Sequence, residues 1–148
     1  EETLWYDVTI KSPRNGRGLM NYGLTQMAQG RYAAALDYFE RALKYTPNYS
    51  VLEINLGIVH GALRRDQEAE QHFRRAIALA PDQSQPYYYY GRWLNMKGRR
   101  VEAIAALKTA IERYNRNFEA RDLLVQVYRA QSDEAAAAQL QAESEKLR

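Results

Sequence analysis

The sequence predicts an all-α protein in which antiparallel helix pairs stack into a right-handed superhelical solenoid of about 3.5 to 4 repeats. Three observations support this prediction. Alanine, leucine, arginine, glutamate and glutamine dominate from Leu19 onward, and all five residues favour helices. Several residue types recur every 34 residues. Each repeat also contains two helical segments separated by a short turn, so a pair of helices is the repeating unit.

The repeat is visible in independent columns of the sequence. Glycine recurs at Gly23, Gly57 and Gly91, alanine at Ala35, Ala69, Ala103 and Ala137 and again at Ala42, Ala76 and Ala110, and proline at Pro47 and Pro81. Glycine on the first helix and alanine on the second remove bulk where two helices cross closely. We expect the large residues of a further column, Phe39, Phe73 and Leu107, to fill the remaining space.

The turns between these columns set the helix boundaries. Short turns at 29–31, 64–66 and 97–99 separate the helices of a unit, and Pro47, Pro81 and Asn115 lie where the second helix must stop. The predicted helices cover residues 17–29, 32–45, 51–63, 67–79, 85–97, 100–113, 118–131 and 133–147. Ser50 with Glu53 predicts a capping box, and Ser84 and Asn117 are expected to accept hydrogen bonds from the next helix.

The predicted domain organisation follows the columns. Three units cover residues 16–49, 50–83 and 84–117. Residues 118–148 are predicted to form a degenerate fourth repeat and a C-terminal capping helix, because Val125 replaces the glycine and the last helix is polar on most faces. Residues 1–13 fit the register from the middle of a unit, which predicts an N-terminal half-repeat helix or a linker.

The columns resemble the tetratricopeptide repeat (TPR) family, whose repeat of this length carries Gly and Ala at the helix crossings and Pro at its end. The segments NYGLTQMAQGRYAAALDYFERALKYTP, NLGIVHGALRRDQEAEQHFRRAIALAP and YGRWLNMKGRRVEAIAALKTAIERYN carry the resemblance. It implies a scaffold that binds a peptide or a protein segment in a concave groove. Trp5, Pro13 and Asn15 resemble the junction in membrane-embedded glycosyltransferases with tetratricopeptide tails, and a truncated repeat is the alternative interpretation.

Composition excludes several classes of function. The net charge of +3 permits an acidic partner but is small for tracking a nucleic acid backbone. The chain has no cysteine, and its two histidines, His60 and His72, lie on different predicted helices without a metal-binding motif. No phosphate loop or nucleophile motif occurs, so we expect no enzyme, no cofactor and no metal site. No stretch is apolar enough to span a bilayer, which predicts a soluble segment without membrane insertion.

The first helix of each unit is expected to line the groove. Counting from the start of each unit, the predicted peptide-binding residues are Met20, Asn21, Leu24, Ile54, Asn55, Ile58, Gln85, Tyr88, Tyr89, Arg92, Asp122 and Gln126. Apolar side chains in such a groove would supply affinity, and amides would pair with the backbone of the ligand. The alternative for Asn21 and Asn55 is that they face solvent or cap a helix, and the alternative for Tyr88 and Tyr89 is that they pack in the core.

Three further interpretations remain open at this stage. Met20, Leu24, Gln85 and Tyr89 stand where chaperone-binding relatives carry their carboxylate clamp, and only Asn55 agrees, so we predict no tight binding of chaperone tails. The half-repeat in 1–13 leaves an incomplete end that would allow self-assembly into a homo-oligomer. Single-stranded RNA binding is a weaker alternative, in which Tyr88, Tyr89 and Arg92 would stack on bases. The chain begins at Glu1, which predicts a region of a larger protein, and its composition indicates neither a cytoplasmic nor a periplasmic or lumenal location.

Overall fold

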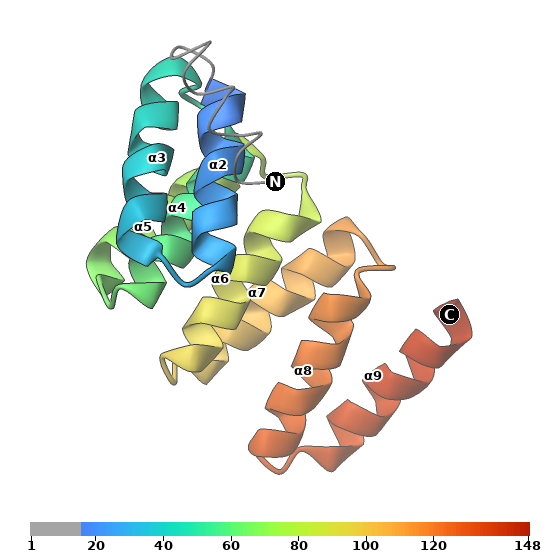
Figure 1. Cartoon of the computed structure of the whole chain (residues 1–148). Helices are drawn as coiled ribbons and strands as arrows, with labels where there is room; N and C mark the ends of the chain where they lie inside the picture. Colours follow the sequence, from blue (N-terminus) through green and yellow to red (C-terminus); the bar gives the residue numbers. More distant parts are fainter. Residues whose placement is uncertain (1–15) are drawn as a thin grey trace. The chain divides into compact units, whose positions relative to one another are not determined.

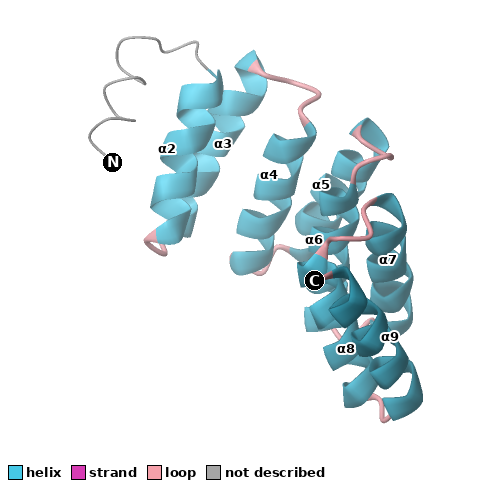
Figure 2. Cartoon of the chain, turned by 90° about the vertical axis from the view of Figure 1, so that its right-hand side faces the viewer, coloured by secondary structure: helices cyan, strands magenta, loops and turns pink. Residues whose placement is uncertain are grey.

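The computed structural model describes residues 16–148, which form eight α-helices and no strand (Figures 1 and 2). The helices, labelled as in Figure 1, are α2 (Gly16–Ala28), α3 (Tyr32–Tyr45), α4 (Ser50–Ala62), α5 (Asp66–Leu79), α6 (Ser84–Met96), α7 (Arg100–Arg113), α8 (Phe118–Ala130) and α9 (Glu134–Leu147). Every predicted helix is confirmed to within one residue at each end. The half-repeat predicted for residues 1–13 lies outside the described residues, as do Trp5, Pro13 and Asn15.

The helices form antiparallel pairs within two compact units. The first unit ends at Leu79 and contains α2 paired with α3 and α4 paired with α5. The second begins at Ala80 and contains α6 paired with α7 and α8 paired with α9. In both units the second helix of one pair also packs on the first helix of the next. The described residues therefore have the all-α helix-pair architecture of a TPR solenoid.

The glycine column lies where the helices of a pair cross, as predicted. A Cβ atom added to Gly57 would lie 2.8 Å from the ring of Phe73. The same contact occurs 34 residues earlier and later, at 2.7 Å between Gly23 and Phe39 and at 2.9 Å between Gly91 and Leu107. Distances this short leave no room for a side chain, so glycine is required at the crossings. The alanine columns are also fully buried, which confirms their predicted role.

The turn inside each helix pair has the same backbone geometry in every repeat. Gly30, Arg64, Gly98 and Ser132 are spaced 34 residues apart, and all four have a positive φ angle between 61° and 78°. This left-handed conformation costs glycine little but is strained for Arg64 and Ser132. The repeat therefore imposes the turn conformation even where the residue type does not favour it.

In the pairs α4–α5 and α6–α7, side-chain hydrogen bonds hold the other end, in place of the helix caps predicted at Ser50 and Ser84. The Ser50 hydroxyl donates to the Ala76 carbonyl at 3.0 Å, and the Ser84 hydroxyl donates to the Ala110 carbonyl at 2.6 Å. The capping predictions for both serines were therefore wrong, because each hydroxyl reaches across to the last turn of the partner helix. Asn117 does cap α8 as predicted, accepting a hydrogen bond from the Ala120 amide.

Candidate peptide-binding faces

In the first unit, the predicted groove residues come from α2 and α4, which lie against each other. We call the surface formed by Met20, Asn21, Leu24, Ile54, Asn55 and Ile58 the α2–α4 face. Asn21, Leu24 and Ile58 are partly exposed, whereas Met20, Ile54 and Asn55 are buried. Met20 belongs to the hydrophobic core of this unit and Leu24 packs against that core. The face therefore combines a mainly aliphatic surface with two amide side chains and no charged group.

Asn55 has an unmet hydrogen-bonding requirement on this face. Its side chain is only 7% exposed, and no acceptor among the described residues bonds to its Nδ2 atom. A buried amide donor without a partner destabilises the folded state by about 1–3 kcal/mol. Buried polar groups of this kind are rare in folded proteins and call for an explanation. An acceptor supplied by a bound molecule would satisfy Asn55.

In the second unit, the predicted residues of α6 form an aromatic and cationic cluster. The rings of Tyr88 and Tyr89 meet edge to face with centroids 4.9 Å apart. The Arg92 guanidinium lies 4.9 Å from the centroid of the Tyr89 ring and 6.0 Å from that of Tyr88. Tyr88 is only 8% exposed and packs in the core with Leu107, and its burial raises the pKa of its phenol. Tyr89 and Arg92 therefore carry most of the accessible surface of this cluster.

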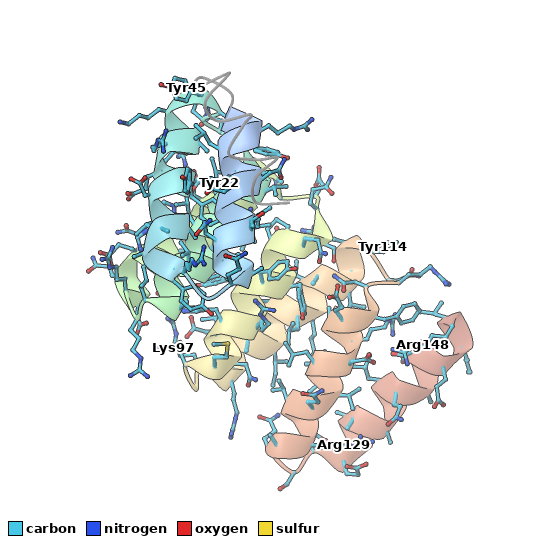
Figure 3. The ribbon with its side chains drawn as sticks, viewed as in Figure 1. Tyr22, Tyr45, Lys97, Tyr114, Arg129 and Arg148 are labelled. Carbon is cyan, nitrogen blue, oxygen red and sulfur yellow. The ribbon has the colours of Figure 1, made fainter. Side chains whose placement is uncertain are left out.

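The remaining predicted residues, Gln85, Asp122 and Gln126, are exposed. Asp122 is not free, because Arg148 donates to both of its carboxylate oxygens at 2.8 Å. Arg148 follows α9 at the C-terminal end of the chain, where Figure 3 labels it. Gln85 accepts a hydrogen bond from the Asn117 amide at 3.3 Å. Gln126 lies with Asp122 and Arg148 along a cavity of about 200 Å³ between α8 and α9. We call Gln85, Tyr88, Tyr89, Arg92, Asp122 and Gln126 the α6–α8 face.

A buried polar network between α4 and α5 was missed by the sequence analysis. Glu53 is fully buried, and its two carboxylate oxygens contact His72 Nδ1 at 2.7 Å and Arg75 Nε at 3.0 Å. The His72 ring stacks on the ring of His60, with centroids 5.2 Å apart and an interplanar angle of 6°. The two histidines, predicted on different helices, are therefore neighbours, and Glu53 serves this network rather than a helix cap.

The signal that identifies this network lies in the repeat itself. Glu53 occupies the column that contains Leu19 and Tyr87 in the neighbouring repeats. A charged residue in a column of core residues indicates a buried ion with partners on the adjacent helix. The same column continues to Arg121, which is also buried and donates to the Asn115 carbonyl at 2.6 Å. Comparing the columns for polarity, rather than only for identity, would have found both residues.

The stability of the chain is expected to fall in mild acid because of His60. Burial is the main cause that lowers its pKa below 6.5, and His72 and Arg65 lower it further, while Glu68 and Glu40 oppose them. Between that lowered pKa and about 6.5 the unfolded chain binds more protons than the folded chain, so acidification through this window favours unfolding. The slope from one such group is at most about 1.4 kcal/mol per pH unit.

Urea unfolding at a series of pH values from neutral to mildly acidic measures this slope. We expect His60→Gln, which removes the titrating ring, to show a shallower loss of stability with falling pH than the unmodified chain. Equal slopes in the two proteins would contradict the assignment to His60.

Two kinds of site are not found in the part of the chain that the structure describes. No group of three or more His, Cys, Asp or Glu side chains is arranged to hold a metal ion within residues 16–148. Among these same residues, no helix has both the length and the apolar character needed to cross a membrane.

Comparison with known families agrees with the helix pairs and their 34-residue spacing. Tetratricopeptide repeat models match residues 15–82 and residues 54–117. The repeated pairs, the glycine crossings and the faces of the first helices define a helical-repeat protein of the kind that serves as an interaction scaffold. The chain belongs to the tetratricopeptide repeat family.

Individual proteins resemble this chain in sequence or in fold. Photosystem I assembly protein Ycf3 of Rippkaea orientalis (strain PCC 8801 / RF-1) is 31% identical over 100 residues, which cover 61% of this chain and 58% of that protein. The chain thus spans less than two thirds of the length of this relative. A thermophilic TPR protein of Thermus thermophilus has a TM-score of 0.84 at 21% identity, covering 97% of this chain and 79% of that one.

A second similar structure contains a bound peptide. The first TPR of Spaghetti (RPAP3), bound to the HSP90 peptide SRMEEVD, has a TM-score of 0.71 at 24% identity and covers 80% of this chain and 94% of its own. At this identity the likeness concerns the fold alone.

Proposed function

We propose that this chain is a non-catalytic interaction module whose α2–α4 face binds a segment of another protein. The observation that supports the proposal most directly is the buried, unpartnered Nδ2 atom of Asn55. A peptide carbonyl is the natural acceptor for this donor, and an amide side chain also accepts from a peptide N–H. Binding would therefore remove the desolvation penalty that the unbound chain carries.

The surroundings of Asn55 favour a polypeptide as the ligand. Asn21 occupies the same register position one repeat earlier and is partly exposed, so its amide is accessible to a bound backbone. The buried amide of Asn55 would reach the same backbone after a shift of the side chains that cover it. Leu24 and Ile58 offer partly exposed aliphatic surface for the ligand's side chains. Because the face carries no charge, its affinity for a peptide would depend little on salt. The RPAP3 structure supports a polypeptide ligand by analogy of fold, because that protein is bound to a peptide.

The α6–α8 face supplies a second, charged contact in the proposal. Arg92 is partly exposed and rests on Tyr89, which holds the guanidinium in place with little loss of side-chain entropy. A stacked guanidinium pairs readily with a carboxylate of a ligand. We therefore expect acidic residues in those partner segments that reach this face.

Replacement of Asn55 by leucine tests the proposal through two opposite effects. The substitution removes a buried donor that lacks a partner, so we expect the free energy of unfolding to rise by about 1 kcal/mol. The same change removes a hydrogen bond to the ligand and is expected to weaken peptide binding about tenfold. Chemical denaturation measures the first effect, and a peptide array followed by fluorescence anisotropy on the selected peptides measures the second.

A matched control replaces an exposed amide in the same unit, Gln71 on α5. Gln71→Leu should leave both stability and peptide binding nearly unchanged. A loss of stability in Asn55→Leu would indicate a structural amide and contradict the proposal. Selected peptides that bind Asn55→Leu as well as the unmodified chain would move the binding site elsewhere.

A further inference from the structure

The turn between α6 and α7 carries the two most exposed large hydrophobic residues of the described chain. Met96 ends α6 and is 71% exposed, and Val101 lies in the first turn of α7 and is 85% exposed. No other large hydrophobic residue of the described chain is more than 55% exposed. We call residues 96–102 the α6–α7 tip. Lys97 projects from this tip in Figure 3.

The fold does not require these two hydrophobic residues. The positions equivalent to Met96 in the other repeats are all alanine, at Ala28, Ala62 and Ala130. The positions equivalent to Val101 are Ala33, Gln67 and Ala135. The same helix–turn–helix geometry thus forms three more times with small or polar residues in these places, including the positive φ angle shared by Gly98 and its counterparts. Exposure of Met96 and Val101 therefore has a reason other than packing.

The tip also differs from its counterparts in charge. Lys97, Arg99, Arg100 and Glu102 give it a net charge of +2. The equivalent residues 28–34, 62–68 and 130–136 have net charges of +1, 0 and −2. Glu102 is held by Arg99 through two hydrogen bonds of 2.8 and 2.9 Å. Arg100 is exposed. Among the four equivalent turns, the α6–α7 tip therefore has the highest positive charge and also carries the most exposed apolar side chains.

We infer that the α6–α7 tip docks on an anionic lipid surface, with Met96 and Val101 entering the headgroup region and the exposed Arg100 pairing with phosphate and carboxylate groups. Side chains as exposed as these cannot line a groove, and a single turn presents less area than the roughly 800 Å² that each partner of a stable protein interface contributes. A bilayer surface needs no complementary shape and accepts a protruding tip. Basic residues add attraction to anionic lipids, which two apolar side chains alone would not supply.

Vesicle flotation of the intact chain tests this inference. The probes are vesicles of phosphatidylcholine alone and vesicles in which about a third of the lipid is phosphatidylserine. We expect binding to the anionic vesicles, weakened at high salt, and little binding to the neutral ones. The double variant Met96→Ala/Val101→Gln places the residue types of the second repeat at these two positions. We expect it to reduce partitioning onto the vesicles about tenfold. Arg100→Asp, again as in the second repeat, is expected to reduce it by a similar factor.

Two controls separate the tip from general effects. Lys108→Glu makes the same change of net charge as Arg100→Asp, but on an exposed part of α7 away from the tip, and should have a much smaller effect on flotation. Asn55→Leu should bind vesicles like the unmodified chain, because Asn55 lies in the other unit.

Absent binding to anionic vesicles, equal binding to neutral vesicles, or tip variants that float like the unmodified chain would each overturn the inference. If the tip variants instead lost concentration-dependent self-association in ultracentrifugation while vesicle binding stayed unchanged, a second copy of the chain would be the partner, and the lipid assignment would be wrong.

Discussion

Phe73→Ala is expected to destabilise the chain by about 3–5 kcal/mol. Phe73 is 1% exposed and its ring lies directly against Gly57, where α4 and α5 cross. Truncation leaves a cavity that the surrounding backbones cannot close, since two helices already in close approach define its walls. The loss is large compared with the roughly 5–15 kcal/mol that stabilises a typical domain. Urea unfolding followed by circular dichroism measures it.

Phe73→Leu is the matched control, because leucine fills the same column at Leu107. We expect a cost of about 1 kcal/mol, since most of the apolar volume remains. If Phe73→Ala were no more costly than Phe73→Leu, the ring would not fill the crossing as the structure shows.

Gly57→Ala is expected to cost about 1–3 kcal/mol, although alanine is the better helix former. In an exposed helix this replacement would add about 1 kcal/mol of stability. Here the added Cβ would lie 2.8 to 2.9 Å from three atoms of the Phe73 ring, so the ring or the helix must shift. The steric cost therefore exceeds the gain in propensity, and the same denaturation experiment measures the difference.

A double-mutant cycle identifies the cause of that cost. With Phe73→Ala already present, the ring that opposes Gly57→Ala is absent, and the glycine substitution should become neutral or stabilising. Additive effects of the two changes would show that the cost arises elsewhere, for example from the backbone of α4.

The fold was largely predictable from the sequence because its determinants are periodic. Gly57 and Phe73 could be assigned to a helix crossing since each recurs at the same spacing in neighbouring repeats. The proline and glycine turns then fixed the helix ends to within one residue. Periodicity averages over several copies, so a departure in one repeat does not obscure the pattern.

Contacts between side chains of different helices were harder to predict. Ser50 and Glu53 have the spacing of a capping box, yet the serine donates across to Ala76 and the carboxylate binds His72 and Arg75. Local spacing could not reveal this, because both partners belong to another helix. Glu53 does not cap the helix, because its carboxylate is fully buried and a buried carboxylate must be paired with a cation or hydrogen-bond donors.

The sequence predicted which helix carries each residue of the candidate faces, but not how exposed each side chain is. Helical register places Met20, Asn55 and Tyr88 on the first helices, and the structure finds all three buried. How deeply a residue lies depends on the size of its neighbours on adjacent helices, which register does not report. The unpartnered amide of Asn55, on which the proposed function depends, becomes visible only when the full set of hydrogen bonds is known.

The two ends of a helix pair differ in how well they would tolerate inserted residues. At one end Ser84, Ala110 and Asn117 are linked by hydrogen bonds of 2.6 and 2.8 Å, so added residues would pull apart buried partners. At the other end a Cβ on Gly30 would meet no heavy atom of the described structure within 4 Å. Extra sequence, whether acquired in evolution or grafted as a reporter, would project from the turn at Gly30 into solvent and leave the helix pair intact.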